Sequence, residues 1–185
     1  MTDTPLSLAD LAGRVARLEA EAAARRLLAR YMFLCDTPLP EPIAPEARAA
    51  AIGALFTEDA IWEGVGGAHG AQFGQHRGPG EIAAHMGRFY AAENPRQIFN
   101  THYLTAEQLH ANSADSAEGN WVQFQPWVYD DGSSLLRSSR LHVRFARTAA
   151  GWRIAHYRTE NLFIGKLPDH WAQTLLTTSV LMAQG

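Results

Sequence analysis

The chain has 185 residues, of which 46% are hydrophobic and 19% are charged, and its formal net charge is −3 at pH 7. This composition excludes wholesale disorder, and the small negative charge gives no basic surface for nucleic acid. No apolar run reaches the roughly 20 residues of a membrane span, and the single cysteine cannot form an internal disulfide. We therefore expect one soluble, cytoplasmic domain over residues 1–185, with an N-terminal helical arm (1–20) and a C-terminal extension (166–185).

The first expected element is a long helix over residues 7–36. Ser7 stands three residues before Asp10, which is the spacing of a capping box, and Thr37-Pro38 ends the helix. In the first half the apolar positions recur at steps of three and four, at Leu8, Leu11, Val15, Leu18 and Ala22. In the second half they move to a different face, at Leu27, Leu28, Tyr31 and Leu34. The two halves thus contact different surfaces, and the first half is either an arm onto a partner subunit or an ordinary packing face.

Two shorter helices are expected over residues 46–56 and 79–92, separated by a short strand at 60–62. A loop with seven glycines occupies residues 64–80, and it fits neither phosphate-binding glycine template.

After residue 97 the apolar period changes from 3.6 to 2, which predicts strands over residues 98–110, 117–129, 135–147 and 152–164. Short, turn-rich connections make these strands antiparallel neighbours. A short helix is expected over residues 168–182. Helices followed by an antiparallel meander define an α+β fold.

Five segments in this order resemble the SnoaL-like branch of the nuclear transport factor 2-like superfamily, and they lie at residues 30–36, 55–62, 78–82, 100–102 and 151–154. The resemblance implies a cone, in which a curved antiparallel sheet of the cystatin-like type wraps around the N-terminal helices and leaves a deep pocket. Within this superfamily, the sequence is similar above all to scytalone dehydratase and to bile-acid 7α-dehydratase-like proteins. Because this fold hosts many functions, the resemblance is more specific for fold than for activity.

The same resemblance implies catalytic roles for Tyr31, Asp36 and His102. It implies a cofactor-independent lyase (dehydratase) or isomerase acting on a hydrophobic, oxygenated cyclic molecule such as a polyketide or steroid. A histidine can accept a proton near neutral pH, a carboxylate can orient its ring, and a phenol can donate to a substrate oxygen. Each residue has a structural alternative: a core aromatic for Tyr31, a turn residue for Asp36 and a buried hydrogen-bonded ring for His102.

Four further residues are expected to contact the ligand, namely Trp62, Trp121, Gln123 and Arg158. Arg158 matches an arginine that lines the pocket of the bile-acid enzyme, with an outward salt bridge as its alternative, and His142 is a weaker pocket candidate. The second acidic residue of that enzyme has no counterpart among Trp121, Gln123 and Gln125, which indicates a pocket lined by amides and aromatics.

No metal and no cofactor are expected, since no histidines show helical metal-ligand spacing. Cys35 is expected to be a buried filler. The alternative function is a non-catalytic small-molecule-binding or partner-subunit module, like the small subunit of ring-hydroxylating dioxygenases.

A homo-oligomer, dimer or higher, is also expected. The apolar face of the N-terminal arm exceeds what one cone covers, and the outer sheet face is expected to bear Leu141, Val143 and Phe145 or their alternates.

Overall fold

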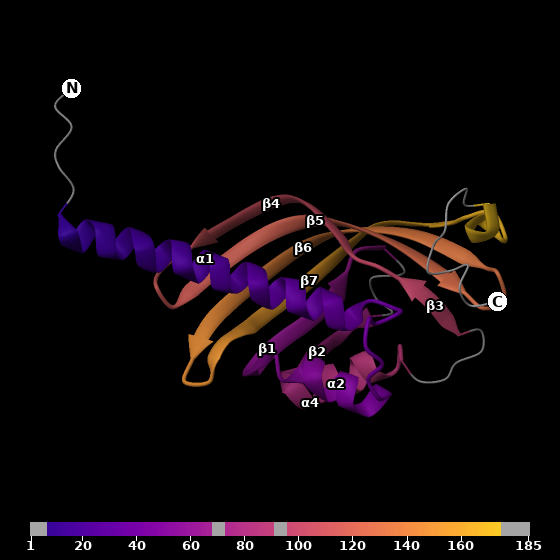
Figure 1. The fold of residues 1–185 in the computed structure, drawn as a ribbon, viewed down its shortest axis with the longest axis horizontal. Helices are drawn as coiled ribbons and strands as arrows, with labels where there is room; N and C mark the ends of the chain where they lie inside the picture. The colour runs from indigo at the N-terminus through magenta and orange to yellow at the C-terminus, as the bar shows by residue number, and fades with distance from the viewer. Residues whose placement is uncertain (1–6, 68–72, 91–95, 175–185) are drawn as a thin grey trace, which may run out of the picture.

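The computed structural model describes residues 7–67, 73–90 and 96–174. Its longest element is helix α1 (Leu8–Cys35), which confirms the expected first helix. The hydroxyl of Ser7 accepts a hydrogen bond from the Asp10 amide at 3.1 Å, and the Asp10 carboxylate accepts one from the Ser7 amide at 3.1 Å. Buried side chains begin only at Ala20, and the N-terminal half of α1 projects beyond the sheet (Figure 1).

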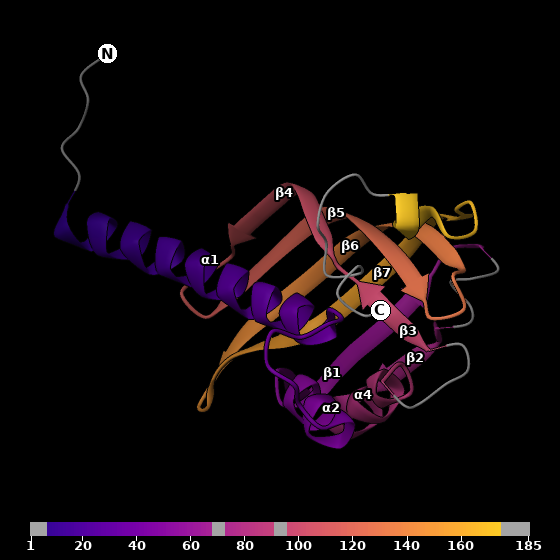
Figure 2. The same ribbon diagram turned by 45° about the vertical axis from the view of Figure 1, so that its right-hand side comes forward.

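Helix α2 (Pro45–Gly53) packs on helix α4 (Gly78–Gly87), and α4 packs on the first strand (Figure 2). Both end earlier than expected. The two helices approach so closely that a Cβ at Gly53 would lie 2.7 Å from the carbonyl oxygen of Pro79. Glycine at this position therefore permits the helix crossing. Residues 91 and 92, at the expected end of the helix over 79–92, lie outside the described residues.

Seven strands form one sheet in the order β2-β1-β7-β6-β5-β3, with β4 also paired to β5. The strands are β1 (Phe56–Val65), β2 (Gln75–Arg77), β3 (Gln97–Asn100), β4 (Tyr103–Ala111), β5 (Ser116–Tyr129), β6 (Ser134–Thr148) and β7 (Gly151–Lys166). The meander from β4 to β7 is antiparallel, as predicted. The sheet is nevertheless mixed, because β1 lies parallel to β7, and it includes β2, which falls in the segment expected to be a loop.

The expected continuous strand over residues 98–110 is wrong in one respect, because it breaks at Thr101 and His102. The backbone of Asn100 instead exchanges two hydrogen bonds with Thr37, just beyond the end of α1. The amide of His102 donates to the Asp36 carboxylate at 3.0 Å rather than to a strand. The break therefore attaches this segment to the end of α1.

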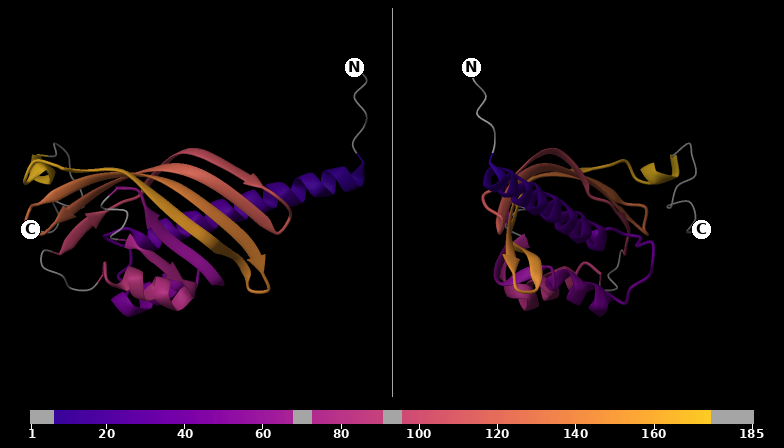
Figure 3. Two further views of the ribbon diagram at one scale, coloured as in Figure 1. Left: turned by 180° about the vertical axis from the view of Figure 1, so that it is seen from behind. Right: turned by 60° about the vertical axis from the view of Figure 1, so that its left-hand side comes forward.

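The strands curl over the C-terminal half of α1 as a half-barrel, and the hydrophobic core lies between them (Figure 3). Leu141, Val143 and Phe145 are at most 2% exposed and face this core. These three side chains form the dry face of β6. Its outer face carries Arg140, His142 and Arg144, so the apolar outer face proposed as a reason for oligomerisation is wrong.

Beyond β7, a short 3-10 helix covers Trp171–Thr174, and the rest of the expected C-terminal helix lies outside the described residues. Among the helices that the structure describes, none is long and apolar enough to cross a membrane.

Candidate active site

A cavity lies between the end of α1 and the inner face of the curled sheet, with an empty volume of about 520 Å³ that includes the part open to solvent. Its polar walls are formed by Tyr31, Asn100, His102, Gln123, Gln125, Arg137 and Thr159. Its aromatic walls are formed by Trp62, Phe73, Phe89, Tyr90, Trp127 and Tyr157. No described residue lining this cavity is acidic.

His102 and Asp36 form a hydrogen-bonded pair at the cavity wall. His102 Nδ1 lies 2.7 Å from Asp36 Oδ1, and the side chains are 10% and 22% exposed. A carboxylate only accepts hydrogen bonds, so the proton of the neutral ring is assigned to Nδ1. His102 lines the cavity whereas Asp36 lies behind it, and Nε2 therefore keeps its lone pair for a ligand. This is the arrangement of a positioned general base.

Arg48 of α2 holds the end of α1 that carries Asp36. Its Nε donates to the carbonyl oxygen of Leu34 at 2.7 Å, and its Nη2 donates to the carbonyl oxygen of Asp36. The guanidinium also stacks on Tyr90, 3.7 Å from the ring centroid. The C-terminal end of a helix leaves its last carbonyl groups without hydrogen-bond donors and favours a nearby positive charge. The buried side chain of Arg48 provides both the donors and the charge from another helix.

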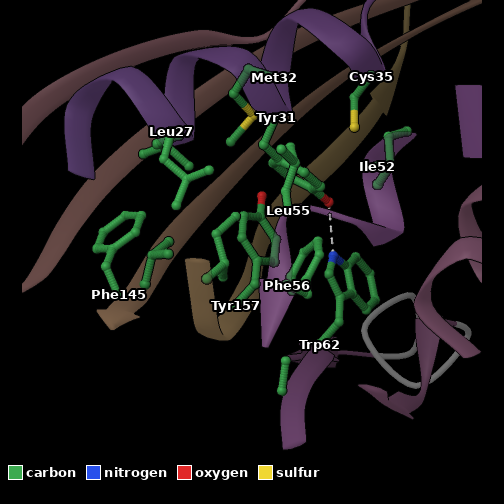
Figure 4. Packing of buried hydrophobic residues seen from close by; sticks show 14 of the residues in the cluster. Leu27, Tyr31, Met32, Cys35, Ile52, Leu55, Phe56, Trp62, Phe145 and Tyr157 are labelled. Carbon is green, nitrogen blue, oxygen red and sulfur yellow. Dashed lines mark hydrogen bonds between the residues drawn. The ribbon is translucent and has the colours of Figure 1, made fainter. Parts of the chain in front are cut away.

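Tyr31 places its hydroxyl in the same cavity. Trp62 Nε1 donates to this hydroxyl at 2.9 Å (Figure 4), and the hydroxyl faces the weak acceptor Met86 Sδ at 3.9 Å. Burial raises the pKa of Tyr31 well above its ordinary value, so the phenol stays protonated. Because its proton has only weak sulfur acceptors, Met86 Sδ and the Cys35 thiol, the hydroxyl is available to donate to a ligand oxygen.

Three amide side chains form a chain of hydrogen bonds along the cavity wall. Asn100 Nδ2 donates to the carbonyl oxygen of Cys35 at 3.0 Å, Gln125 Nε2 donates to Asn100 Oδ1 at 2.6 Å, and Gln123 Nε2 donates to Gln125 Oε1 at 2.5 Å. The carbonyl of Cys35 can only accept, so it fixes the orientation of every amide in the chain. The last acceptor, Gln123 Oε1, is buried without a partner.

Arg137 of β6 is 6% exposed and lines the cavity. Its Nε donates to Ser139 Oγ at 3.1 Å and its Nη2 to Thr159 Oγ1 at 3.4 Å. The guanidinium lies 4.4 Å from the ring centroid of Phe73. Burial lowers the pKa of Arg137, and no ion pair joins it to an acidic side chain of the described residues.

Of the residues expected to contact a ligand, Trp62 and Gln123 line the cavity and Trp121 and Arg158 do not. Trp121 packs at the other end of the core, where its Nε1 donates to Glu107 at 3.2 Å. Arg158 lies on the outer face and forms an ion pair with Glu160 at 3.6 Å, which was its stated alternative. His142 also lies on that outer face, with its ring 6.4 Å from that of His156.

A bulge explains part of this placement. The pairing of β6 with β7 shifts between Arg144 and Phe145, so that Ile154 and Tyr157 both point inward although they lie three positions apart. The strict period of two expected from the sequence assigns these two residues to opposite faces of the strand.

Two residues near the cavity have strongly shifted pKa values. Burial raises the pKa of Cys35 to about 12, which suits the expected filler role. Burial, with smaller effects of His76 and Arg88, lowers the pKa of His85 to about 3. No group of three or more His, Cys, Asp or Glu side chains within the described ranges is arranged to hold a metal ion.

Comparison with known proteins identifies the family. Residues 16–158 match the model of the SnoaL-like domain. The chain belongs to this family. The SnoaL-like domain is part of the nuclear transport factor 2-like superfamily, which confirms the resemblance drawn from the five sequence segments. A search of curated proteins finds no match.

Solved structures share the fold at low sequence identity. A hexachlorocyclohexane dehydrochlorinase, LinA Type2, aligns with a TM-score of 0.64 and 19% identity over 84% of this chain and 93% of that chain. A proposed scytalone dehydratase from Novosphingobium aromaticivorans aligns with a TM-score of 0.64 and 11% identity over 82% and 89%. An NTF2-like protein with a cystatin-like fold, also from Novosphingobium aromaticivorans, aligns with a TM-score of 0.58 and 24% identity over 93% and 98%. At these identities the likeness establishes the fold of the SnoaL-like chain.

Arg48 and Arg137 are absent from the residues expected at the site from the sequence. Arg137 has the same parity on its strand as the inward-facing Leu141, Val143 and Phe145, and extending that alternation back to it would have placed the guanidinium inside. Arg48 carries no comparable signal, because nothing in an alanine-rich helix indicates a distant helix end as its partner.

Proposed function

We propose that this SnoaL-like chain is a cofactor-independent lyase of the dehydratase type, or an isomerase, that acts on a hydrophobic, oxygenated cyclic molecule. The observation that carries the proposal is the 2.7 Å hydrogen bond between His102 Nδ1 and Asp36 Oδ1, with the other ring nitrogen left to the cavity. A ring held at one nitrogen and facing a cavity with the other has the geometry that a general base requires.

In the proposed reaction His102 Nε2 takes a proton from a carbon next to a carbonyl group. The Asp36 carboxylate stabilises the imidazolium that forms, and Tyr31 donates a hydrogen bond to the substrate oxygen on which negative charge builds. For a lyase, the electron pair of the broken C–H bond becomes a double bond, and the hydroxyl on the adjacent carbon leaves as water with a proton from the imidazolium. For an isomerase, the same proton returns to another carbon.

Two observations support this class of reaction. Two fold neighbours, a dehydrochlorinase and a proposed scytalone dehydratase, are named for elimination reactions. The cavity walls carry aromatic rings together with a few polar groups, which is the usual composition of a site for a small apolar ligand. Trp62 and Gln123 are proposed as ligand contacts.

The test is a screen of hydroxylated cyclic ketones, followed by three variants assayed on the substrate found. His102→Ala should lose about 10²–10⁴-fold in rate with its melting temperature retained. Asp36→Asn should also lose activity, because an amide does not stabilise an imidazolium, and Tyr31→Phe isolates the hydroxyl from the packing of the ring. Turnover that survives His102→Ala would contradict the mechanism. Binding without turnover for every ligand would favour the non-catalytic module instead.

The chain is further proposed to form a homodimer through the N-terminal half of α1. Proteins of this fold commonly form oligomers. Along this half the apolar side chains repeat as positions a and d of a heptad and are exposed, from 44% at Leu11 to 86% at Leu8, with Val15 and Leu18 between these values. Ala20, which faces the chain's own sheet, lies on the opposite side of the helix. A second helix therefore has access to this stripe without displacing the body.

Charge indicates that the second helix is another copy in parallel orientation. In a parallel pair, position g of one helix faces position e of the following heptad in the other. Arg14 then faces Glu19 of the partner subunit, and this attractive pairing occurs twice across the two-fold axis. Glu21 does not contribute, because its carboxylate accepts a hydrogen bond from the Ala111 amide at 3.3 Å and pairs with Arg25 at 3.6 Å in its own chain. The cytoplasm is proposed as the site of action because the chain carries a single, buried thiol.

A further inference from the structure

Arg137 is a buried cation for which the described residues offer no counterion. An arginine stays protonated in proteins, and a buried charge without a partner destabilises the fold. The polar neighbours of the guanidinium are two neutral hydroxyls, those of Ser139 and Thr159, and its Nη1 makes no hydrogen bond with them. The cavity therefore holds one positive charge that a ligand can neutralise.

The surrounding side chains do not supply the opposite charge. Tyr31, Tyr90 and Tyr157 line the same cavity, and burial raises the pKa of each so that it stays neutral. Gln125 lies directly opposite Arg137 across the β5–β6 pair, and its amide is committed to the chain of amides.

We propose that the ligand of this cavity is a carboxylic acid whose carboxylate pairs with Arg137, so that the substrate class is a hydroxylated cyclic carboxylic acid. This inference rests on the proposed function for the ring and the hydroxyl, and on Arg137 alone for the carboxylate. One guanidinium neutralises one negative charge, and its planar fork matches the two oxygens of a carboxylate. A phosphate ester would bring a second, uncompensated charge into a buried site.

Two other unsatisfied groups fit the same ligand. Trp127 Nε1 is a buried donor without a partner, and the ring of Trp127 lies 5.8 Å from the Arg137 guanidinium. This donor can contribute to binding the carboxylate. Gln123 Oε1 is a buried acceptor without a partner and requires a donor, which a ligand hydroxyl supplies. The cavity thus offers hydrogen-bond donors at Arg137 and Trp127. It also offers an acceptor at Gln123, which lies on β5 together with Trp127.

The experiment measures binding, by calorimetry and thermal shift, of aromatic and alicyclic hydroxy acids and of the amide matched to each. The unaltered protein should bind each acid at least about tenfold more tightly than its amide, as expected for a hydrogen bond to a charged group. Arg137→Met should abolish this preference. Arg140→Met, on the same strand but facing outward and 57% exposed, should keep it. Equal binding of acids and amides by the unaltered protein would overturn the proposal without recourse to any variant.

Two further readouts complete the test. Without ligand, Arg137→Met should melt at the same or a higher temperature than the parent, because it removes an unpaired buried charge; a markedly lower value would assign Arg137 a structural role and overturn the proposal. Stabilisation by acetate or chloride equal to that by the hydroxy acids would reduce the site to one for simple anions, and would likewise overturn it. Binding of the acids that depends on Arg137, without turnover that depends on His102, would refute the proposed catalysis alone. Turnover of neutral ketones that survives Arg137→Met would refute only the proposal that the substrate carries a carboxylate.

Discussion

Arg48→Met should strongly destabilise the fold, because Arg48 joins the end of α1 to α2. The substitution keeps an apolar stem of similar length and removes the guanidinium. Two hydrogen bonds to carbonyl oxygens of Leu34 and Asp36 are lost, each contributing about 1.5–3 kcal/mol when one partner is charged. The stacking on Tyr90 contributes up to about 2 kcal/mol where it is desolvated.

These contributions overlap, so we expect a loss of about 3–5 kcal/mol from a total stability of about 5–15 kcal/mol. Urea denaturation followed by circular dichroism measures the change. Arg30→Met, at an exposed position of α1, is the matched control and should change stability by less than about 0.5 kcal/mol. A loss below about 1 kcal/mol for Arg48→Met, at an unchanged denaturant slope, would show that water or other groups satisfy these carbonyls, and it would refute the reasoning.

Two more predictions address acidity and assembly. The pKa of His85 is lowered to about 3 in the folded protein, so the unfolded chain binds an extra proton below about pH 6.5; stability should be fully present above that pH and fall towards pH 3, by at most about 1.4 kcal/mol per pH unit from this group. His85→Gln and His85→Phe should both flatten this part of the stability–pH curve, and a parent-like slope in both would exclude His85 as its source. Light scattering should give a dimer mass for the parent and a monomer mass for the double variant Leu11→Asp, Leu18→Asp. Arg144→Asp, on the outer sheet face, should remain dimeric. A dimeric double variant would show that the interface does not lie on the N-terminal half of α1, and a monomeric parent would refute assembly.

The fold was largely accessible from the sequence because its signals are local. A capping box, a change of apolar period and turn-rich connections set the first helix and the antiparallel meander. The errors arise where tertiary contacts override those signals. The strand expected over residues 98–110 breaks because the Asn100 backbone pairs with Thr37, and the phase of β7 changes at a bulge that leaves no mark in the sequence.

The candidate site was accessible only in part, for the same reason. Asp36 and His102 are separated by 66 positions, and their pairing was expected only from a family resemblance. Arg158 was expected in the pocket although the arginine that reaches the cavity is Arg137, on the neighbouring strand. Both residues belong to polar-rich strand segments, and the structure is needed to decide which face each side chain takes.

The end of α1 explains how a carboxylate comes to be free to orient the histidine. The last carbonyls of a helix need partners from outside it, and here Asn100 donates to Cys35 and Arg48 donates to Leu34 and Asp36. These donors satisfy the backbone, so the side chain of Asp36 has no capping duty and accepts instead from the amide and the ring of His102. The amide contact fixes the carboxylate and the ring contact fixes the tautomer, so the orientation of the ring depends on Asp36, whose backbone Arg48 holds in place. A substitution that weakens this junction, Arg48→Lys for example, should therefore lower the rate of turnover more than it weakens ligand binding, since the cavity walls stay in place while the base loses its orientation.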